Sequence, residues 1–212
     1  MGRQERSGEV RRQVVATALK LFLEKGYAET TLREISASAG VSYGSIYHHF
    51  SDKEGIFLEL VLDGFERTQL LADDELSSQQ SAYLRLALKW AGLIQAASAN
   101  LRVAELLAVA YGSWKITRVL MEVSTARHRD WLKSELPDWS DSQFMAASYV
   151  LKGAVSSVID ERIHLDQLTT KERIAAVLSA ALPGFGASPE ATRRVMQKVL
   201  RTVERLPLTT LK

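Results

Sequence analysis

The stretch TTLREISASAGVSYGSIYHHFSDK, residues 30–53, decides how the N-terminal part of this chain folds. Thr31 and Glu34 have the S/T-x-x-E spacing of a capping box, which predicts a helix that begins at Thr31. Gly40 ends this helix, because a residue just past a helix end often needs a positive φ that glycine adopts without steric cost. A short helix and a tight turn are therefore expected here.

A second short helix follows the turn. Ser42 is its expected N-cap, and Ile46 and Phe50 lie four residues apart on the buried side of a helix from Tyr43 to Phe50. Solvated helix faces usually carry Lys and Glu, whereas tyrosines, small hydroxyls and histidine suit contact with phosphates and base edges. The residues predicted to face outward are Tyr43, Gly44, Ser45, Tyr47 and His48.

A third helix should start at once, because Ser51 and Glu54 repeat the capping-box spacing. Two short helices joined by a glycine turn are the helix-turn-helix pattern, which places its second helix in the major groove of DNA. An ordinary pair of packed helices in an all-helical protein produces the same pattern. The pattern alone leaves both interpretations open.

Residues 8–62 closely resemble the N-terminal signature of the tetracycline-repressor (TetR) family of one-component regulators, almost without a gap. The segments that carry the resemblance are Gly26-Tyr27, Thr30–Ile35, Ala39–Ser42 and Ile46–Glu54. Glycines, caps, apolar positions and exposed residues all fall in register. The resemblance implies an all-α protein with an N-terminal three-helix helix-turn-helix domain and a larger C-terminal helical domain for ligand binding and dimerisation.

The resemblance also implies how the N-terminal helices meet double-stranded operator DNA. It implies that mainly Tyr43, Gly44 and Ser45 contact bases. It implies that Thr31, Tyr47, His49 and Lys53 contact phosphates. The complete expected DNA-binding set is Thr31, Ser42, Tyr43, Gly44, Ser45, Tyr47, His48, His49 and Lys53.

Composition sets further bounds on the 212-residue chain. Apolar residues make up 46%, which supports a substantial core, and there is no cysteine for a disulfide. No uncharged apolar run reaches the roughly 18 residues that a membrane span needs, and the charged N-terminus does not read as a signal peptide. We therefore expect a cytoplasmic protein with no membrane partner.

The formal net charge of +2 is concentrated at one end of the chain. Residues 1–53 contain eight Lys and Arg against six Asp and Glu, whereas the remainder balances 19 against 19. This small excess agrees with a nucleic-acid surface that depends on well-placed contacts more than on a strong basic field. Residues 1–7, with Arg3 and Arg6, are expected to form either an arm that reaches DNA or a solvated tail.

The sequence predicts two domains, residues 1–53 for DNA binding and residues 54–212 for ligand binding and dimerisation. Hydrophobic periodicity and caps predict helices throughout and no β-strand. The expected helices have approximate ranges of 8–25, 31–39, 43–50, 52–72, 82–100, 101–111, 117–136, 143–165, 170–182 and 189–206, and residues 73–81 are expected to be a polar linker.

A helix-turn-helix protein usually reads two half-sites one turn of DNA apart, so a homodimer is expected. The helices at 143–165 and 170–182 are the candidate interface, and the family commonly forms a four-helix bundle from the corresponding pairs. Internal packing of a buried helix is the alternative. The small residues that would allow close approach are Ala146, Ala147, Gly153, Ala154, Ser156 and Ser157.

Aromatic and polar residues also occur in the helices that line a cavity in the resembled family. The candidate ligand-binding set is Trp90, Arg102, Glu105, Tyr111, Trp114, Arg118 and Tyr149. A pocket is typically apolar with a few placed polar groups, but aromatics at helical spacing are often simply core residues. The expected effector is a small, largely apolar molecule.

The chain contains no zinc-protease motif, nucleophile elbow, P-loop or dinucleotide-binding glycine set, so no enzyme activity, catalytic residue, cofactor or metal site is expected. The sequence as a whole predicts a homodimeric repressor that binds a palindromic operator and is released by a small molecule. The alternative is a DNA-binding protein regulated by a protein partner, without a small-molecule effector.

Overall fold

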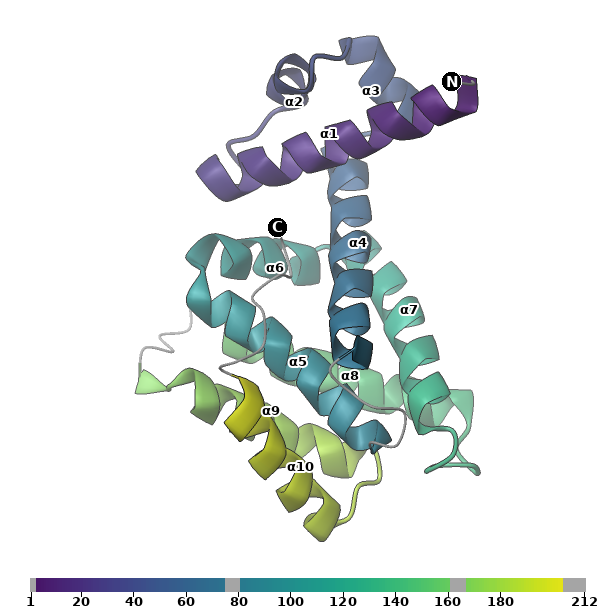
Figure 1. The fold of residues 1–212 in the computed structure, drawn as a ribbon, viewed down its shortest axis with the longest axis vertical. Helices are drawn as coiled ribbons and strands as arrows, with labels where there is room; N and C mark the ends of the chain where they lie inside the picture. The colour runs from purple at the N-terminus through teal and green to yellow at the C-terminus, as the bar shows by residue number, and fades with distance from the viewer. Residues whose placement is uncertain (1–2, 75–80, 161–166, 204–212) are drawn as a thin grey trace. The chain divides into compact units, whose positions relative to one another are not determined.

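The computed structural model describes residues 3–74, 81–160 and 167–203, which form α-helices and no β-strand (Figure 1). The all-α class predicted from the sequence is therefore confirmed. No helix in these ranges is long and apolar enough to cross a membrane. The helices are α1 (Arg3–Lys25), α2 (Leu32–Ala39), α3 (Tyr43–His49), α4 (Lys53–Asp74), α5 (Ala82–Ala99), α6 (Leu101–Gly112), α7 (Trp114–Leu132), α8 (Asp141–Ile159), α9 (Thr170–Gly184) and α10 (Pro189–Thr202).

The chain packs as two units that meet within α4, between Phe65 and Glu66. Unit 1 contains α1, α2, α3 and the first part of α4, and unit 2 contains the helices from α5 onward. The sequence-based boundary at residue 53 instead marks the start of α4. Caps are visible in a sequence, whereas the point at which one continuous helix changes its packing partners is not.

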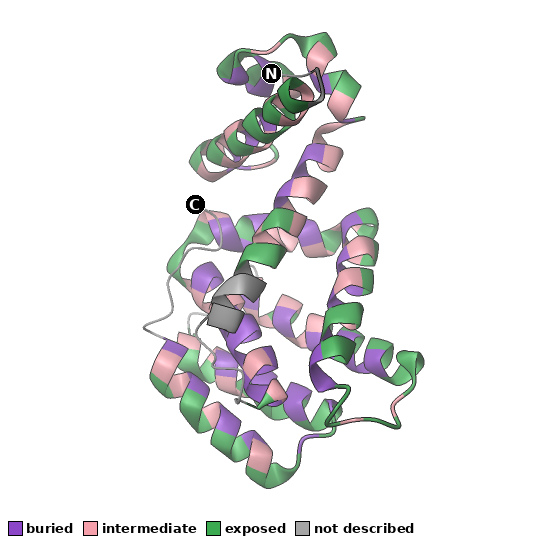
Figure 2. Cartoon of the chain, turned by 45° about the vertical axis from the view of Figure 1, so that its right-hand side comes forward, coloured by how far each residue is buried: buried purple, intermediate pink, exposed green. Residues whose placement is uncertain are grey.

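Unit 1 is held by a small apolar core to which each of its four helices contributes (Figure 2). The rings of Phe22, Tyr27 and Phe57 contact one another, with centroid separations between 4.8 and 5.7 Å. Helices of 8 and 7 residues, such as α2 and α3, are too short to be stable alone, so this core is what maintains them. Its buried side chains are Val14, Ala18, Phe22, Ile35, Ala39, Ile46, Phe50, Ile56, Phe57 and Leu60.

Unit 2 is organised around α5, which contacts α6, α7, α8, α9 and α10. Eleven of its 18 residues are buried, as expected of a central helix that is apolar nearly all round. The turn between α9 and α10 depends on Gly186, which has φ +77°. A Cβ there would lie 2.9 Å from Leu136 Cδ2, so both the conformation and the space require glycine.

Several helix ends differ from the sequence prediction. Helix α1 begins at Arg3, so the arm or tail expected over residues 1–7 is wrong for residues 3–7. Helix α7 begins at Trp114 rather than Thr117, because the Ser113 side chain caps it by accepting from the Ile116 amide at 3.3 Å. Helix α8 ends at Ile159, and the predicted residues 161–165 lie outside the described residues, as does most of the predicted linker.

Candidate nucleic-acid interface

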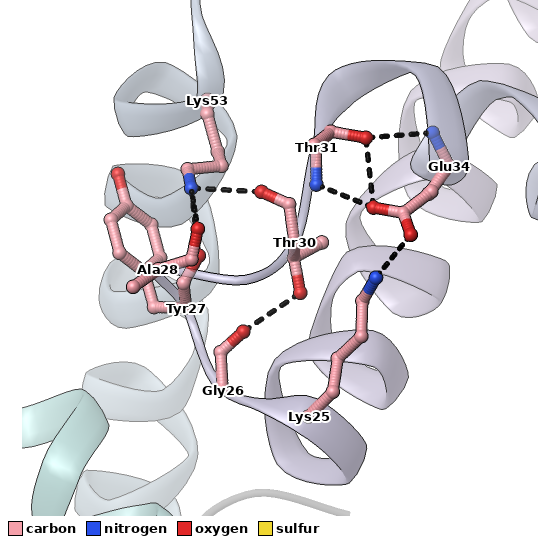
Figure 3. Close-up of polar contacts among 8 residues, drawn as sticks. All are labelled: Lys25, Gly26, Tyr27, Ala28, Thr30, Thr31, Glu34 and Lys53. Atoms are coloured by element: carbon pink, nitrogen blue, oxygen red, sulfur yellow. Dashed lines mark hydrogen bonds and ion pairs between the residues drawn. The ribbon is translucent and has the colours of Figure 1, made fainter.

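Helix α2 begins with the predicted capping box, which the structure confirms (Figure 3). The Glu34 amide donates to Thr31 Oγ1 at 3.3 Å, while Glu34 Oε2 accepts from the Thr31 amide at 2.9 Å and from its hydroxyl at 2.8 Å. Lys25 also pairs with Glu34, and these contacts, the one with Lys25 foremost, lower the pKa of Glu34 to about 2. Both donors of Thr31 therefore point to Glu34, so in this arrangement neither is available to a phosphate.

The turn between α2 and α3 is fixed by backbone and side-chain bonds. Gly40 has φ +64°, the left-handed conformation that the sequence predicts at this position. The Ser36 hydroxyl donates to the Val41 carbonyl at 2.7 Å, and the Val41 amide donates to the Ser36 carbonyl at 3.2 Å. Gln13 of α1 donates to the Ala39 carbonyl at 2.8 Å. These bonds set the direction in which α3 leaves the turn.

Helix α3 buries one side and presents the other to solvent. Ser42 caps it by accepting from the Ser45 amide at 3.1 Å, and Ile46 is 0% exposed, as predicted. Tyr43 and Tyr47 are 41% and 50% exposed, which is high for aromatic side chains. The remaining members of the expected DNA-binding set on this helix are also accessible: Ser42, Gly44 and His48 are exposed, and Ser45 and His49 are half-buried.

The two exposed tyrosines contact each other. Their hydroxyl oxygens are 3.2 Å apart, and their rings meet edge to face at 5.1 Å between centroids and 76° between planes. Tyr43 and Tyr47 are i and i+4 on the helix, where side chains are neighbours. The hydrogen bond to Tyr43 raises the pKa of Tyr47. The sequence predicted that both residues face outward but did not reveal that they form a pair.

Gly44 leaves an open place beside this pair. A Cβ built there would meet no atom within 4 Å, and the φ of Gly44 is not among the positive ones. The fold therefore does not require glycine at residue 44. A bare backbone in the first turn of α3 can approach another molecule more closely than any other residue would permit.

Lys53 is turned into unit 1, away from the role of phosphate contact that the resemblance implied (Figure 3). Its ammonium donates to the carbonyls of Tyr27 at 2.7 Å and Thr30 at 2.8 Å, with the Ala28 carbonyl at 3.4 Å. It also lies 4.2 Å from the centroid of the Tyr27 ring. Burial lowers the pKa of Lys53. The loop between α1 and α2 has carbonyls without helical partners, and Lys53 satisfies them.

The start of α4 also differs from the prediction. Asp52 caps it, because Asp52 Oδ1 accepts from the Gly55 amide at 2.7 Å, so the capping box expected for Ser51 and Glu54 is wrong. Arg33 is a candidate that the sequence reasoning missed. It is exposed in the first turn of α2, and it is the only Lys or Arg between residues 31 and 50. That isolation was visible in the sequence.

The expected ligand-binding set is spread over unit 2. Trp90 is buried in α5, and Tyr111 of α6 is half-buried, where burial raises the pKa of its hydroxyl. Arg102 and Glu105 form an ion pair at 2.6 Å along α6, and Trp114 is 70% exposed with Arg118 5.9 Å from its ring. The exposed members do not line the interior of the unit in this structure, and Tyr149 is likewise exposed on α8.

The interior of unit 2 instead contains a polar cluster around His128, which is 0% exposed. The Trp90 indole donates to His128 Nε2 at 3.3 Å, and His128 Nδ1 lies 2.8 Å from Ser148 Oγ. An indole can only donate, so Nε2 must be unprotonated and Nδ1 carries the hydrogen, which it donates to Ser148. The buried Lys89 ammonium lies 5.2 and 5.5 Å from the rings of Trp90 and Trp131.

Helices α1, α2 and α3 form a helix-turn-helix unit. Its last helix, α3, exposes the side that carries hydroxyl and aromatic groups. A family model described as bacterial regulatory proteins, tetR family, matches residues 14–60. Residues 14–60 are therefore similar to the DNA-binding region of the tetR family.

Curated relatives match the same region. The regulator HbdR of Aromatoleum is 48% identical over 62 residues, which are 28% of this chain and 27% of HbdR. The repressor AcnR of Corynebacterium diphtheriae is 40% identical over 57 residues, 27% of this chain and 30% of AcnR. The regulator AcrR of Shigella flexneri is 40% identical over 57 residues, 27% of this chain and 26% of AcrR. The alignments thus span less than a third of each of these relatives.

Solved structures resemble the fold over most of the chain. RolR in complex with resorcinol has a TM-score of 0.69 at 18% identity, covering 92% of this chain and 97% of RolR. SmeT, the repressor of a Stenotrophomonas maltophilia multidrug efflux pump, has a TM-score of 0.58 at 20% identity, covering 82% of this chain and 88% of SmeT. At these identities the likeness establishes the fold of the described helices.

Proposed function

We propose that this protein is a transcriptional repressor that binds palindromic operator DNA as a homodimer through α3. The observation that carries the proposal is the exposed side of α3, where tyrosines, hydroxyls and a histidine replace the usual Lys and Glu. Such groups can donate to phosphates and address base edges in the major groove. The names of the relatives that match this unit, repressors and regulators, support the same function.

The dimer is proposed to form through α8, with α9 packed beside it. Met145, Tyr149 and Val150 are 49%, 49% and 59% exposed on α8. The exposed Ala146, Gly153 and Ser157 extend the same side of the helix, and the half-buried Lys152 at its edge lies 5.5 Å from the centroid of the Tyr111 ring. A largely apolar strip of this kind is unusual on a free surface, and a second copy of the same helix would cover it symmetrically.

A small molecule is proposed to bind in unit 2 and to release the DNA. Trp90 and Tyr111 remain the interior members of the candidate set, and the cluster of Lys89, His128 and Ser148 beside Trp90 supplies polar groups that a ligand could address. A ligand lowers DNA affinity only by binding the released state more tightly than the DNA-bound state. Since RolR binds resorcinol, small phenols are the first compounds to test.

The test is selection of binding sites from a pool of randomised duplexes, followed by affinity measurements on the selected sequence. We expect a palindromic site with half-sites about one turn of DNA apart, and weaker binding after Val150→Glu because the dimer dissociates. Light scattering would measure the molar mass of each protein in solution and so distinguish a dimer from a monomer. Failure to enrich any sequence would refute the DNA-reading proposal. A monomer that bound DNA as tightly as wild type would refute the dimer.

A further inference from the structure

The hydrogen bond between Tyr43 and Tyr47 limits what Tyr43 can read on DNA. A tyrosine hydroxyl has a single hydrogen and two lone pairs. The two oxygens lie 3.2 Å apart, so one hydroxyl donates its only hydrogen to the other. The hydroxyl that donates is left with lone pairs alone, whereas the one that accepts keeps a hydrogen for another partner. The direction of this bond therefore decides which chemistry each tyrosine presents.

DNA sets this direction, given the proposed function. The N-terminal residues of a recognition helix contact base edges, and Tyr43 is the first residue of α3. Tyr47 lies one turn later and is 50% exposed. In the proposed complex its hydroxyl reaches a phosphate at the wall of the groove. A phosphate oxygen can only accept. The Tyr47 hydroxyl must then donate its single hydrogen to the phosphate, so the Tyr43 hydroxyl must donate to Tyr47.

We propose that Tyr47 makes Tyr43 a hydrogen-bond acceptor, and that Tyr43 thereby selects adenine or cytosine on the strand it contacts. These bases present an amino group in the major groove, whereas guanine and thymine present carbonyl oxygens there. The inference rests on the proposed DNA-reading function of α3. Tyr47 is the positioning residue, since it acts on the base through Tyr43. The edge-to-face ring contact at 5.1 Å holds the pair in this geometry before DNA arrives.

The experiment measures the affinity of wild type, Tyr47→Phe and Tyr43→Phe for the selected operator with each of the four bases at every position. Wild type should prefer adenine or cytosine over guanine or thymine roughly 3- to 10-fold at one position in each half-site, the range for one net hydrogen bond. Tyr47→Phe should bind all sites more weakly and flatten the preference at that position alone. Tyr43→Phe should abolish the same preference. Circular dichroism would verify that both variants fold.

A second set of duplexes removes the amino group from the preferred base by using purine in place of adenine, or 2-pyrimidinone in place of cytosine. Wild type should lose the same roughly 3- to 10-fold in affinity on these duplexes, and Tyr43→Phe should lose nothing further. If Tyr47→Phe weakens binding by one factor at all positions and every base preference persists, the relay is refuted. A wild-type preference for guanine or thymine that depends on Tyr43 would also refute it. If wild type enriches no sequence, the proposed function itself fails.

Discussion

The two units place the same kinds of side chain in opposite environments. In unit 1, Tyr43, Tyr47 and His48 lie on the surface of α3, and the hydroxyls of the two tyrosines pair with each other. In unit 2, His128 is fully buried and both of its ring nitrogens have partners within the protein. A buried polar group must be satisfied internally, whereas an exposed one can keep its capacity for another molecule. The comparison separates a histidine whose hydrogen bonds are made within unit 2 from surface side chains of α3 that can still bind another molecule.

The largest expected difference is between the two histidine environments. His128→Ala should lower the free energy of unfolding of unit 2 by about 3 kcal/mol, because it leaves a cavity and removes the partners of Trp90 and Ser148. His48→Ala should change stability by less than about 0.5 kcal/mol. Urea unfolding is the appropriate measurement. Tryptophan fluorescence follows unit 2, which contains all four tryptophans, and far-ultraviolet circular dichroism follows the whole protein, so that a loss in unit 1 is also detected. Equal losses in both variants would contradict the comparison.

Acidification should expose the same contrast more gently. Burial, assisted by the nearby Lys89 charge, lowers the pKa of His128 well below its ordinary 6.5. The folded protein therefore binds a proton at His128 more weakly than the unfolded chain does. As a result, the free energy of unfolding is fully present above pH 6.5 and decreases as the pH falls below that value. Wild type should lose about 1.5 kcal/mol more than His128→Gln between pH 6.5 and 5. Parallel pH profiles for the two proteins would show that His128 is not the titrating group.

Two cations of unit 1 sharpen the comparison further. Lys53→Met should destabilise unit 1 by about 1–2 kcal/mol, because the carbonyls of Tyr27 and Thr30 lose the bond from the ammonium. Arg33→Gln should leave stability nearly unchanged, since Arg33 is exposed. Tyrosine fluorescence and far-ultraviolet circular dichroism would follow unit 1, which has no tryptophan.

The salt dependence of operator binding should also distinguish Lys53 from Arg33, but here the Arg33 variant should show the larger change. A side chain that neutralises a phosphate contributes about 1 to the slope of log affinity against log salt. Arg33→Gln should reduce that slope by about 1, and Lys53→Met should leave it unchanged. A slope that falls in Lys53→Met would show that Lys53 leaves its internal carbonyls and contacts a phosphate, as the resemblance implied.

The sequence predicted what depends on local rules. The box of Thr31 and Glu34, the left-handed Gly40 and the buried Ile46 follow from residues a few positions apart, and all three are confirmed. It could not predict where the Lys53 ammonium points, because its partners Tyr27 and Thr30 lie more than 20 residues earlier. Long, flexible side chains choose among competing acceptors only once the tertiary structure brings those acceptors together.

The interior of unit 2 was equally beyond local rules. Trp90, His128 and Ser148 lie on three different helices, and their spacing along the sequence does not indicate that they are in contact. The hydrophobic periodicity identified α5 as the central helix, but it did not distinguish the aromatic residues of α5 from those of α7. Trp90 is buried, whereas Trp114, the first residue of α7 after the Ser113 cap, is 70% exposed. Which face of a helix is buried depends on its neighbours as well as on its own pattern.

Among the substitutions expected to change stability, Gly44→Ala has the smallest effect, and it tests how closely DNA approaches α3. Gly44→Ala should stabilise unit 1 by about 0.5–1 kcal/mol, because alanine is the better helix former and its Cβ meets no atom within 4 Å. Operator affinity should nevertheless fall if the backbone of α3 lies against the groove. Gly112→Ala, also helical and also unobstructed, is the matched control and should leave DNA binding unchanged. Full operator affinity in Gly44→Ala would mean that the tyrosines hold the DNA away from the α3 backbone, and base contact at residue 44 would have to be abandoned.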